Sequence, residues 1–151
     1  MVLRAELLPP AVDRRRLDET EREIGRIEEL VRKDDASAPA EIAAFNARTG
    51  HTYLAVDFAA YEGSRSLAAF ALEAARPARP RVAGVTRPEL VELVRLVQAA
   101  GPESAWYLRA LQANVSHPRV ADLLFHPPLR LRHASPERIV EELLRYRSLA
   151  F

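Results

Sequence analysis

Three histidines and one aspartate in the C-terminal third of the chain are the side chains whose types could do chemistry. Imidazole nitrogens and a carboxylate can share a zinc ion or transfer a proton, but helical zinc motifs place two histidines at i and i+4. Here no two histidines have that helical spacing, and two of them stand directly before prolines at expected loop ends. The spacing therefore predicts neither an enzyme nor a metal or other cofactor. The four residues are His117, Asp122, His126 and His133.

The segment 117–127 is instead typical of a protein-binding surface. Prolines near both of its ends favour the start and the end of a short helix. Within that helix Asp122, Phe125 and His126 fall at i, i+3 and i+4, so they share one face. A rigid aromatic side chain beside a charge is the composition of an interface hot spot. The leucine pair at 123–124 points away from this face and can reach a core.

The spacing leaves a second interpretation of this segment open. It could be a connector in which Phe125 is part of the core and Asp122 caps a nearby backbone group. In either case, we expect His117 to satisfy backbone groups at the turn that precedes the helix.

Composition limits the function classes that the chain can belong to. With 151 residues it is long enough for one domain or two small ones, and it has no cysteine, which excludes disulfides and thiol nucleophiles. Lys33 is the single lysine among 22 basic residues, yet the formal net charge of +1 argues against a basic nucleic-acid coat. Neither a signal peptide nor an apolar run of about 18 residues is present, so we expect a soluble, cytoplasmic protein without membrane contact.

Residues 1–80 are expected to form an N-terminal helical region of unknown role. Ser37 and Asp57 are candidate caps for two of its helices. His51 stands alone in a loop and is expected to be solvated. A proline-rich, extended connector over 76–85 marks the domain boundary. Helices are expected over 13–33, 37–48 and 57–61, and from Ser64 or Ser66 to 75, the first of them packed within this chain.

Residues 81–151 are expected to form a four-helix domain with a short third helix, which makes the fold class all-α. Thr86 and Glu89 form a capping box at the start of its first helix, and Gly101 ends that helix. Trp106 is expected to lie in the core. Ser135 caps the last helix, with an apolar stripe of Ile139, Val140, Leu143, Leu144 and Tyr146.

Three motifs of this C-terminal domain resemble the immunity proteins of E-type DNase colicins and S-type pyocins. Their order and spacing agree over roughly residues 86–150. The motifs are Thr86-x-x-Glu89-Leu90-Val91-x-Leu93-Val94, His117-Pro118-x-x-x-Asp122-Leu123-Leu124-Phe125-His126-Pro127, and Ser135-Pro136-x-x-Ile139-Val140 with Tyr146-Arg147.

This resemblance implies a non-catalytic inhibitor that binds the nuclease domain of a cognate toxin beside its active site. In that family the short third helix carries a shared hot spot of one aspartate and two tyrosines, and the second helix carries the partner-specific contacts. On this chain the hot spot corresponds to Asp122, Phe125 and His126. The specificity contacts correspond to Ala105, Leu108, Arg109 and Gln112.

The sequence departs from the family in two respects. Phe125 and His126 replace both hot-spot tyrosines, and the often acidic loop reads Leu-Arg-Leu-Arg-His over 129–133. Electrostatic steering towards a basic nuclease is therefore not expected. Two other functions remain open. One is a helical scaffold or oligomerisation module built on 13–33, and the other is a nucleic-acid-binding regulator that uses Arg76, Arg79, Arg81 and Arg87.

Overall fold

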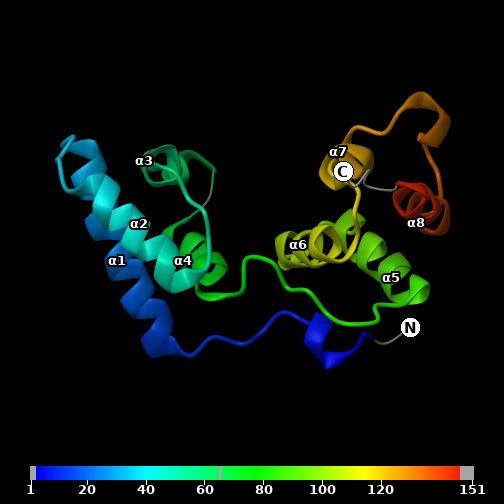
Figure 1. Cartoon of the computed structure of the whole chain (residues 1–151), viewed down its shortest axis with the longest axis horizontal. Coiled ribbons are helices and arrows are strands. Elements are labelled where there is room, and N and C mark those ends of the chain that lie inside the picture. The colour runs from blue at the N-terminus through cyan, green and yellow to red at the C-terminus, as the bar shows by residue number, and fades with distance from the viewer. Residues whose placement is uncertain (1–2, 65, 147–151) are drawn as a thin grey trace, which may run out of the picture. The chain divides into compact units, whose positions relative to one another are not determined.

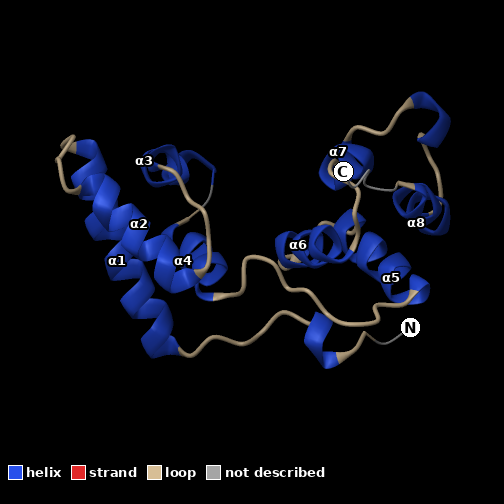
Figure 2. Cartoon of the chain, in the orientation of Figure 1, coloured by secondary structure: helices blue, strands red, loops and turns tan. Residues whose placement is uncertain are grey.

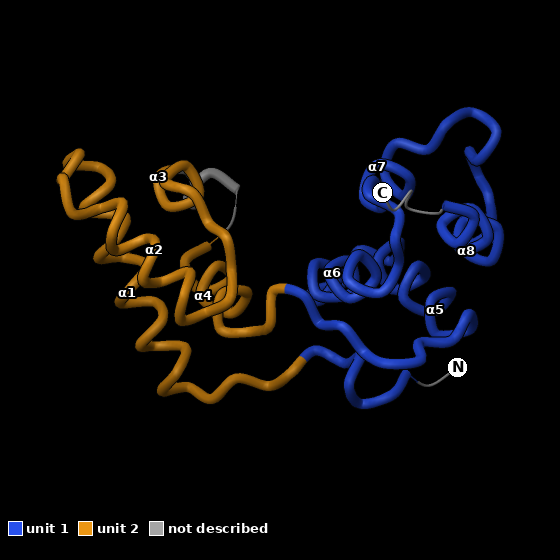
Figure 3. The backbone as a smooth tube through the Cα atoms, in the orientation of Figure 1, with its two compact units in different colours: residues 1–9, 79–151 blue, residues 10–78 orange. Residues whose placement is uncertain are grey.

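The chain is all-helical and forms two compact units. The computed structural model describes residues 3–64 and 66–146, and every regular element in these ranges is a helix (Figures 1 and 2). The predicted all-α fold class is therefore confirmed. Unit 2 is Pro10–Ala78, and unit 1 combines Met1–Pro9 with Arg79–Phe151 (Figure 3). Within the described ranges, no helix combines the length and the apolar character needed to cross a membrane.

Local capping sets the starts of two helices in unit 2. The Asp13 carboxylate accepts a hydrogen bond from the backbone N of Arg16 at 2.8 Å, and the Ser66 hydroxyl accepts one from the backbone N of Ala69 at 3.1 Å. Gly50, with φ 78, ends the second helix in the left-handed conformation that glycine adopts readily. The helices are α1 (Arg14–Arg32), α2 (Ala38–Thr49), α3 (Ala55–Ser64) and α4 (Leu67–Ala75).

Two caps predicted in unit 2 are wrong. Ser37 precedes α2 but makes no capping bond, because its hydroxyl and its backbone N both donate to the Asp35 carboxylate. Asp57 lies inside α3, where its carboxylate accepts the backbone N–H of Leu54 at 2.7 Å. A carboxylate at the third position of a helix often accepts the backbone N–H of the residue just before the helix in this way. In both places, hydrogen bonds between near neighbours in the sequence decide the role of the side chain.

Aromatic rings fill the core of unit 2. Phe45, Phe58 and Phe70 are all buried. The ring of Phe58 meets Phe45 edge-on with centroids 5.6 Å apart and lies 5.3 Å from that of Phe70. Ile24 and Ile27 of α1 complete this core, so the apolar stripe of the first helix packs within the chain, as predicted.

His51 is buried in unit 2, so the prediction that it is solvated is wrong. Its ring stacks on Tyr53 with centroids 4.9 Å apart, and its Nε2 lies 2.8 Å from the backbone oxygen of Arg76. The histidine thus joins the loop after α2 to the end of α4.

Unit 1 contains the four helices expected in the C-terminal domain. The predicted capping box is present, with the Glu89 carboxylate accepting the Thr86 N–H at 2.9 Å. The left-handed residue after the first of these helices is Ala100 (φ 53), not Gly101. The Ser135 hydroxyl caps the last helix, as predicted. The elements are α5 (Arg87–Gln98), α6 (Ser104–Asn114), α7 (Val120–Phe125), α8 (Pro136–Arg145) and the 3₁₀ helices η1 (Ala5–Leu7) and η2 (Leu129–Leu131).

Residues 3–9 pack into unit 1, which differs from the predicted division of the chain at residue 80. We call them the N-terminal strap. Leu3 and Leu7 are buried in the same core as the apolar faces of α5, α6 and α8. The Arg4 Nε donates to the Glu89 carboxylate at 2.8 Å, and the indole Nε1 of Trp106 donates to the backbone oxygen of Leu7 at 3.0 Å. Trp106 itself is buried, as predicted.

Stability is expected to fall in acid as Glu89 becomes protonated. The hydrogen bond from Arg4, with further hydrogen bonds from Thr86, lowers the pKa of Glu89 from 4.5 to about 2. A carboxyl group whose pKa is lower in the folded state stabilises it above pH 4.5, and this contribution is lost as the pH falls from 4.5 towards 2. Urea unfolding between pH 7 and pH 3 should therefore show a difference between wild type and Glu89→Gln that shrinks in acid. Glu137→Gln, at an exposed glutamate, serves as the control.

Candidate protein-binding surface

Helix α7 carries the three residues predicted as a hot spot on its exposed side. Phe125 is 54% exposed, and Asp122 and His126 are exposed as well. Leu123 and Leu124 are buried in the core of unit 1, as their predicted direction required. The interpretation of Phe125 as a core residue is therefore wrong. A short helix thus holds an aromatic ring and a carboxylate in solvent, while its leucines fix it to the bundle.

The turn before α7 is held by a histidine. The Nδ1 of His117 accepts a hydrogen bond from the backbone N of Arg119 at 3.0 Å, which confirms that this side chain satisfies a backbone group. The ring of His117 also lies 5.2 Å from that of Tyr146, centroid to centroid, at the end of α8. His117 therefore connects the turn before α7 to the end of α8.

The carboxylate of Asp122 does not act as a local cap. Within the described part of the chain it accepts no hydrogen bond and forms no ion pair, although its backbone oxygen accepts the N–H of His126 at 2.7 Å. An exposed carboxylate without an internal partner is free to accept hydrogen bonds from another molecule.

The predicted specificity residues recur along one side of α6. Ala105 and Gln112 are exposed, and Leu108 and Arg109 are half-buried. The guanidinium carbon of Arg109 lies 5.5 Å from the ring centroid of Trp106, so this side chain lies over a buried aromatic ring. α6 also contacts α7, which places the two predicted sets of residues on neighbouring elements.

Two residues of the apolar stripe predicted for α8 lie outside the core. Leu144 and Tyr146 are exposed, whereas Ile139, Val140 and Leu143 are buried. Only Ile139, Val140 and Leu143 of the predicted stripe therefore belong to the core of unit 1, and Tyr146 lies just beyond the end of α8.

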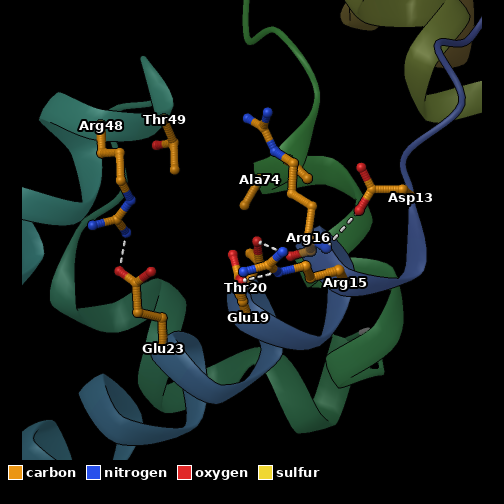
Figure 4. A pocket seen from close by; sticks show the side chains of 10 residues that line it. Asp13, Arg15, Arg16, Glu19, Thr20, Glu23, Arg48, Thr49 and Ala74 are labelled. Carbon is orange, nitrogen blue, oxygen red and sulfur yellow. Dashed lines mark hydrogen bonds and ion pairs between the residues drawn. The ribbon is translucent and has the colours of Figure 1, made fainter.

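The histidines do not assemble into a metal site. Across the residues that the structure describes, no group of three or more histidine, cysteine, aspartate or glutamate side chains is placed to hold a metal ion. Unit 2 does contain an open pocket of about 500 Å³ beside the start of α1, shown in Figure 4. Its charges pair with one another, Arg15 with Glu19 and Arg48 with Glu23. This pairing leaves the pocket without a strong excess of either charge.

The four arginines predicted for a nucleic-acid regulator do not form one exposed set. Arg76 is buried, and its Nε donates to the backbone oxygen of Pro10 at 2.9 Å. Arg79, Arg81 and Arg87 are exposed. One of the four is therefore used to close unit 2, and the basis for this function is weakened.

Sequence reasoning missed the residue that fixes the connector to the bundle. The side-chain amide of Asn114 donates to the backbone oxygen of Pro80 at 3.0 Å, and its Oδ1 accepts the N–H of Val82 at 2.9 Å. An asparagine at the end of a helix gives no signal in the sequence that distinguishes this contact from solvent exposure.

Comparison with known protein families finds a similarity in the C-terminal part of the chain. Residues 82–149 match the family described as colicin immunity protein / pyocin immunity protein. The match spans α5 to α8 and confirms the resemblance for this segment. The N-terminal strap and unit 2 lie outside it. No curated protein and no solved structure gives a significant match to the chain.

Proposed function

With residues 82–149 matching the colicin and pyocin immunity proteins, we propose that this protein is a bacteriocin immunity protein. It binds a cognate toxin domain by protein–protein contact in the cytoplasm and protects the producing cell without catalysing a reaction. The observation that carries the proposal is the exposure of Phe125 beside the free carboxylate of Asp122 on α7.

The geometry of α7 suits a binding hot spot. Burial of the Phe125 ring against a partner would remove a large apolar surface from water, and partner N–H groups would satisfy the Asp122 carboxylate in the desolvated interface. Leu123 and Leu124 already fix the helix to the core, so little conformational entropy is lost on binding. Such a surface binds tightly because it is preorganised.

The exposed residues of α6, the helix next to α7, are placed to discriminate between partners. Ala105 and Gln112 are exposed there. Side chains at such positions set the difference in binding free energy between partners, because a mismatched toxin would clash with them or leave polar groups unpaired. We propose that these positions, with Leu108 and Arg109, discriminate between toxins. The toxin activity that we propose is that of a nuclease, which a protein bound beside its active site blocks by excluding the nucleic acid.

The test is binding to the toxin domain encoded next to the gene, in a catalytically inactivated form. Asp122→Ala and Phe125→Ala should each weaken binding by about 2 kcal/mol or more, which is about 30-fold in Kd, measured by calorimetry. Leu54→Ala removes an apolar side chain of comparable exposure, 66%, from unit 2 and should leave the Kd unchanged.

Circular dichroism of each variant verifies that the helices are retained. Wild-type affinity in both α7 variants would show that the surface is misassigned. Absence of binding by the wild type at any salt concentration would contradict the immunity role itself.

A further inference from the structure

The segment from Arg119 to Arg132 runs through α7 and η2 and exposes an unusual combination of side chains. Leu129 is 77% exposed, only four residues after the exposed ring of Phe125. The arginines at 119, 130 and 132 are also exposed. Figure 1 shows the chain leaving α7 and passing through a long loop before α8. We call residues 119–132 the arginine segment.

The charge of the arginine segment is positive and largely uncompensated. It contains three arginines and one acidic residue, Asp122. In the described part of the chain, Arg119 and Arg132 form no ion pair, and Asp122 forms none either. Two exposed guanidinium groups are therefore available to a partner, each with five N–H donors suited to carboxylates.

The third arginine is fixed in place by α8. Arg130 donates to the Glu142 carboxylate at 2.6 Å, and this contact lowers the pKa of Glu142. Arg138 and Arg145 approach the same carboxylate at 3.9 and 3.7 Å. Glu142 thus lies among three guanidinium groups and does not make the adjoining surface acidic. The ion pair also fixes η2 to α8, so the arginine segment is held at its far end.

We propose that the partner presents a carboxylate-rich surface to the arginine segment, with an apolar patch that receives Phe125 and Leu129. This inference rests on the proposed function and specifies the chemistry of the toxin face that the arginine segment contacts, which lies beside the nucleic-acid site of the nuclease and outside it. A protein interface buries apolar side chains at its centre and pairs charges around them, which matches leucine, phenylalanine and flanking arginines.

Nucleic acid fits the same residues less well. The free carboxylate of Asp122 shares the exposed side of α7 with Phe125 and repels any anion placed against it. Nucleic acid carries a phosphate at every linkage, whereas a protein surface can place an N–H donor against Asp122 and carboxylates against Arg119 and Arg132. Leu129 has no ring on which a base could stack. The combination therefore favours an acidic protein surface over a phosphate backbone.

Charge reversal tests the proposal, because replacing arginine by glutamate should weaken binding to an acidic surface and strengthen binding to a basic one. Arg119→Glu and Arg132→Glu in the full chain should each weaken binding to the inactivated toxin domain by about tenfold at low salt, with a smaller loss in 0.5 M NaCl (about a 4 Å screening length). Arg119 is the residue before α7, where a negative charge favours the helix N-terminus, so this variant should fold. Arg22→Glu, at an exposed arginine of α1, is the matched control and should not change the Kd.

The other outcomes are distinguishable. Tighter or unchanged binding by both variants, with binding by the wild type, would overturn the acidic partner and leave the immunity role standing. No binding by the wild type would overturn the immunity role and this inference together. Retardation of DNA by the wild type at low salt, abolished by both variants, would assign the arginine segment to nucleic acid instead.

Discussion

Leu7→Ala is expected to destabilise unit 1 by about 2–5 kcal/mol, a cost typical of removing a buried leucine side chain. The side chain of Leu7 is 0% exposed and packs in the core that α5, α6 and α8 share. The cavity left by the substitution lies under the strap, where the indole of Trp106 donates to the backbone oxygen of the same residue. Because the chain has a single tryptophan, its fluorescence during urea unfolding reports on this unit directly.

Leu8→Ala is the matched control for this prediction. It removes the same atoms from the adjacent residue, which is 43% exposed, and should cost no more than about 0.5 kcal/mol. Equal effects of the two substitutions would contradict the packing of the N-terminal strap into unit 1.

Phe70→Ala is expected to destabilise unit 2 by about 3–5 kcal/mol. The ring of Phe70 is buried, with its centroid 5.0 Å from that of Tyr53 and 5.3 Å from that of Phe58. Its loss removes apolar burial together with two aromatic contacts from a small core. Far-UV circular dichroism during thermal unfolding, combined with limited proteolysis within residues 10–78, should detect the loss of this unit at lower temperature.

Leu54→Ala provides the comparison in the same unit, because Leu54 is 66% exposed. Its melting curve should match that of the wild type. A Phe70→Ala protein that melts with the wild type would mean that the aromatic cluster does not form the core of unit 2.

Most features that depend on neighbours in the sequence were predictable, although the caps expected at Ser37 and Asp57 are wrong. The Thr86–Glu89 capping box and the cap at Ser135 are present, and Ser66 is the one of the two candidate serines that caps α4, because a cap needs only the following turn of helix. The shared exposed side of Asp122, Phe125 and His126 likewise follows from spacing on a single helix. Whether these three residues bind a partner remains a prediction.

Features that depend on distant partners were not predictable. His51 is buried because the Arg76 carbonyl and the Tyr53 ring receive it, and nothing around His51 in the sequence indicates either contact. Leu7 lies in a short segment without a helical repeat, so its place in the core depends on elements more than 80 residues away. In α7, periodicity left open whether Phe125 is buried, because a six-residue helix has too few positions to define a buried face.

The N-terminal strap has a consequence for the order in which this protein folds during synthesis. Unit 2 is continuous in sequence, so all of its residues leave the ribosome together and it can fold while the rest of the chain is still being translated. Leu3 and Leu7 emerge before it but find their partners only after α5, α6 and α8 have been made. Until then, the two leucines and Arg4 lack their native contacts, because Glu89 and Trp106 are synthesised more than 80 residues later. Of the two units, unit 1 is therefore the later one to fold.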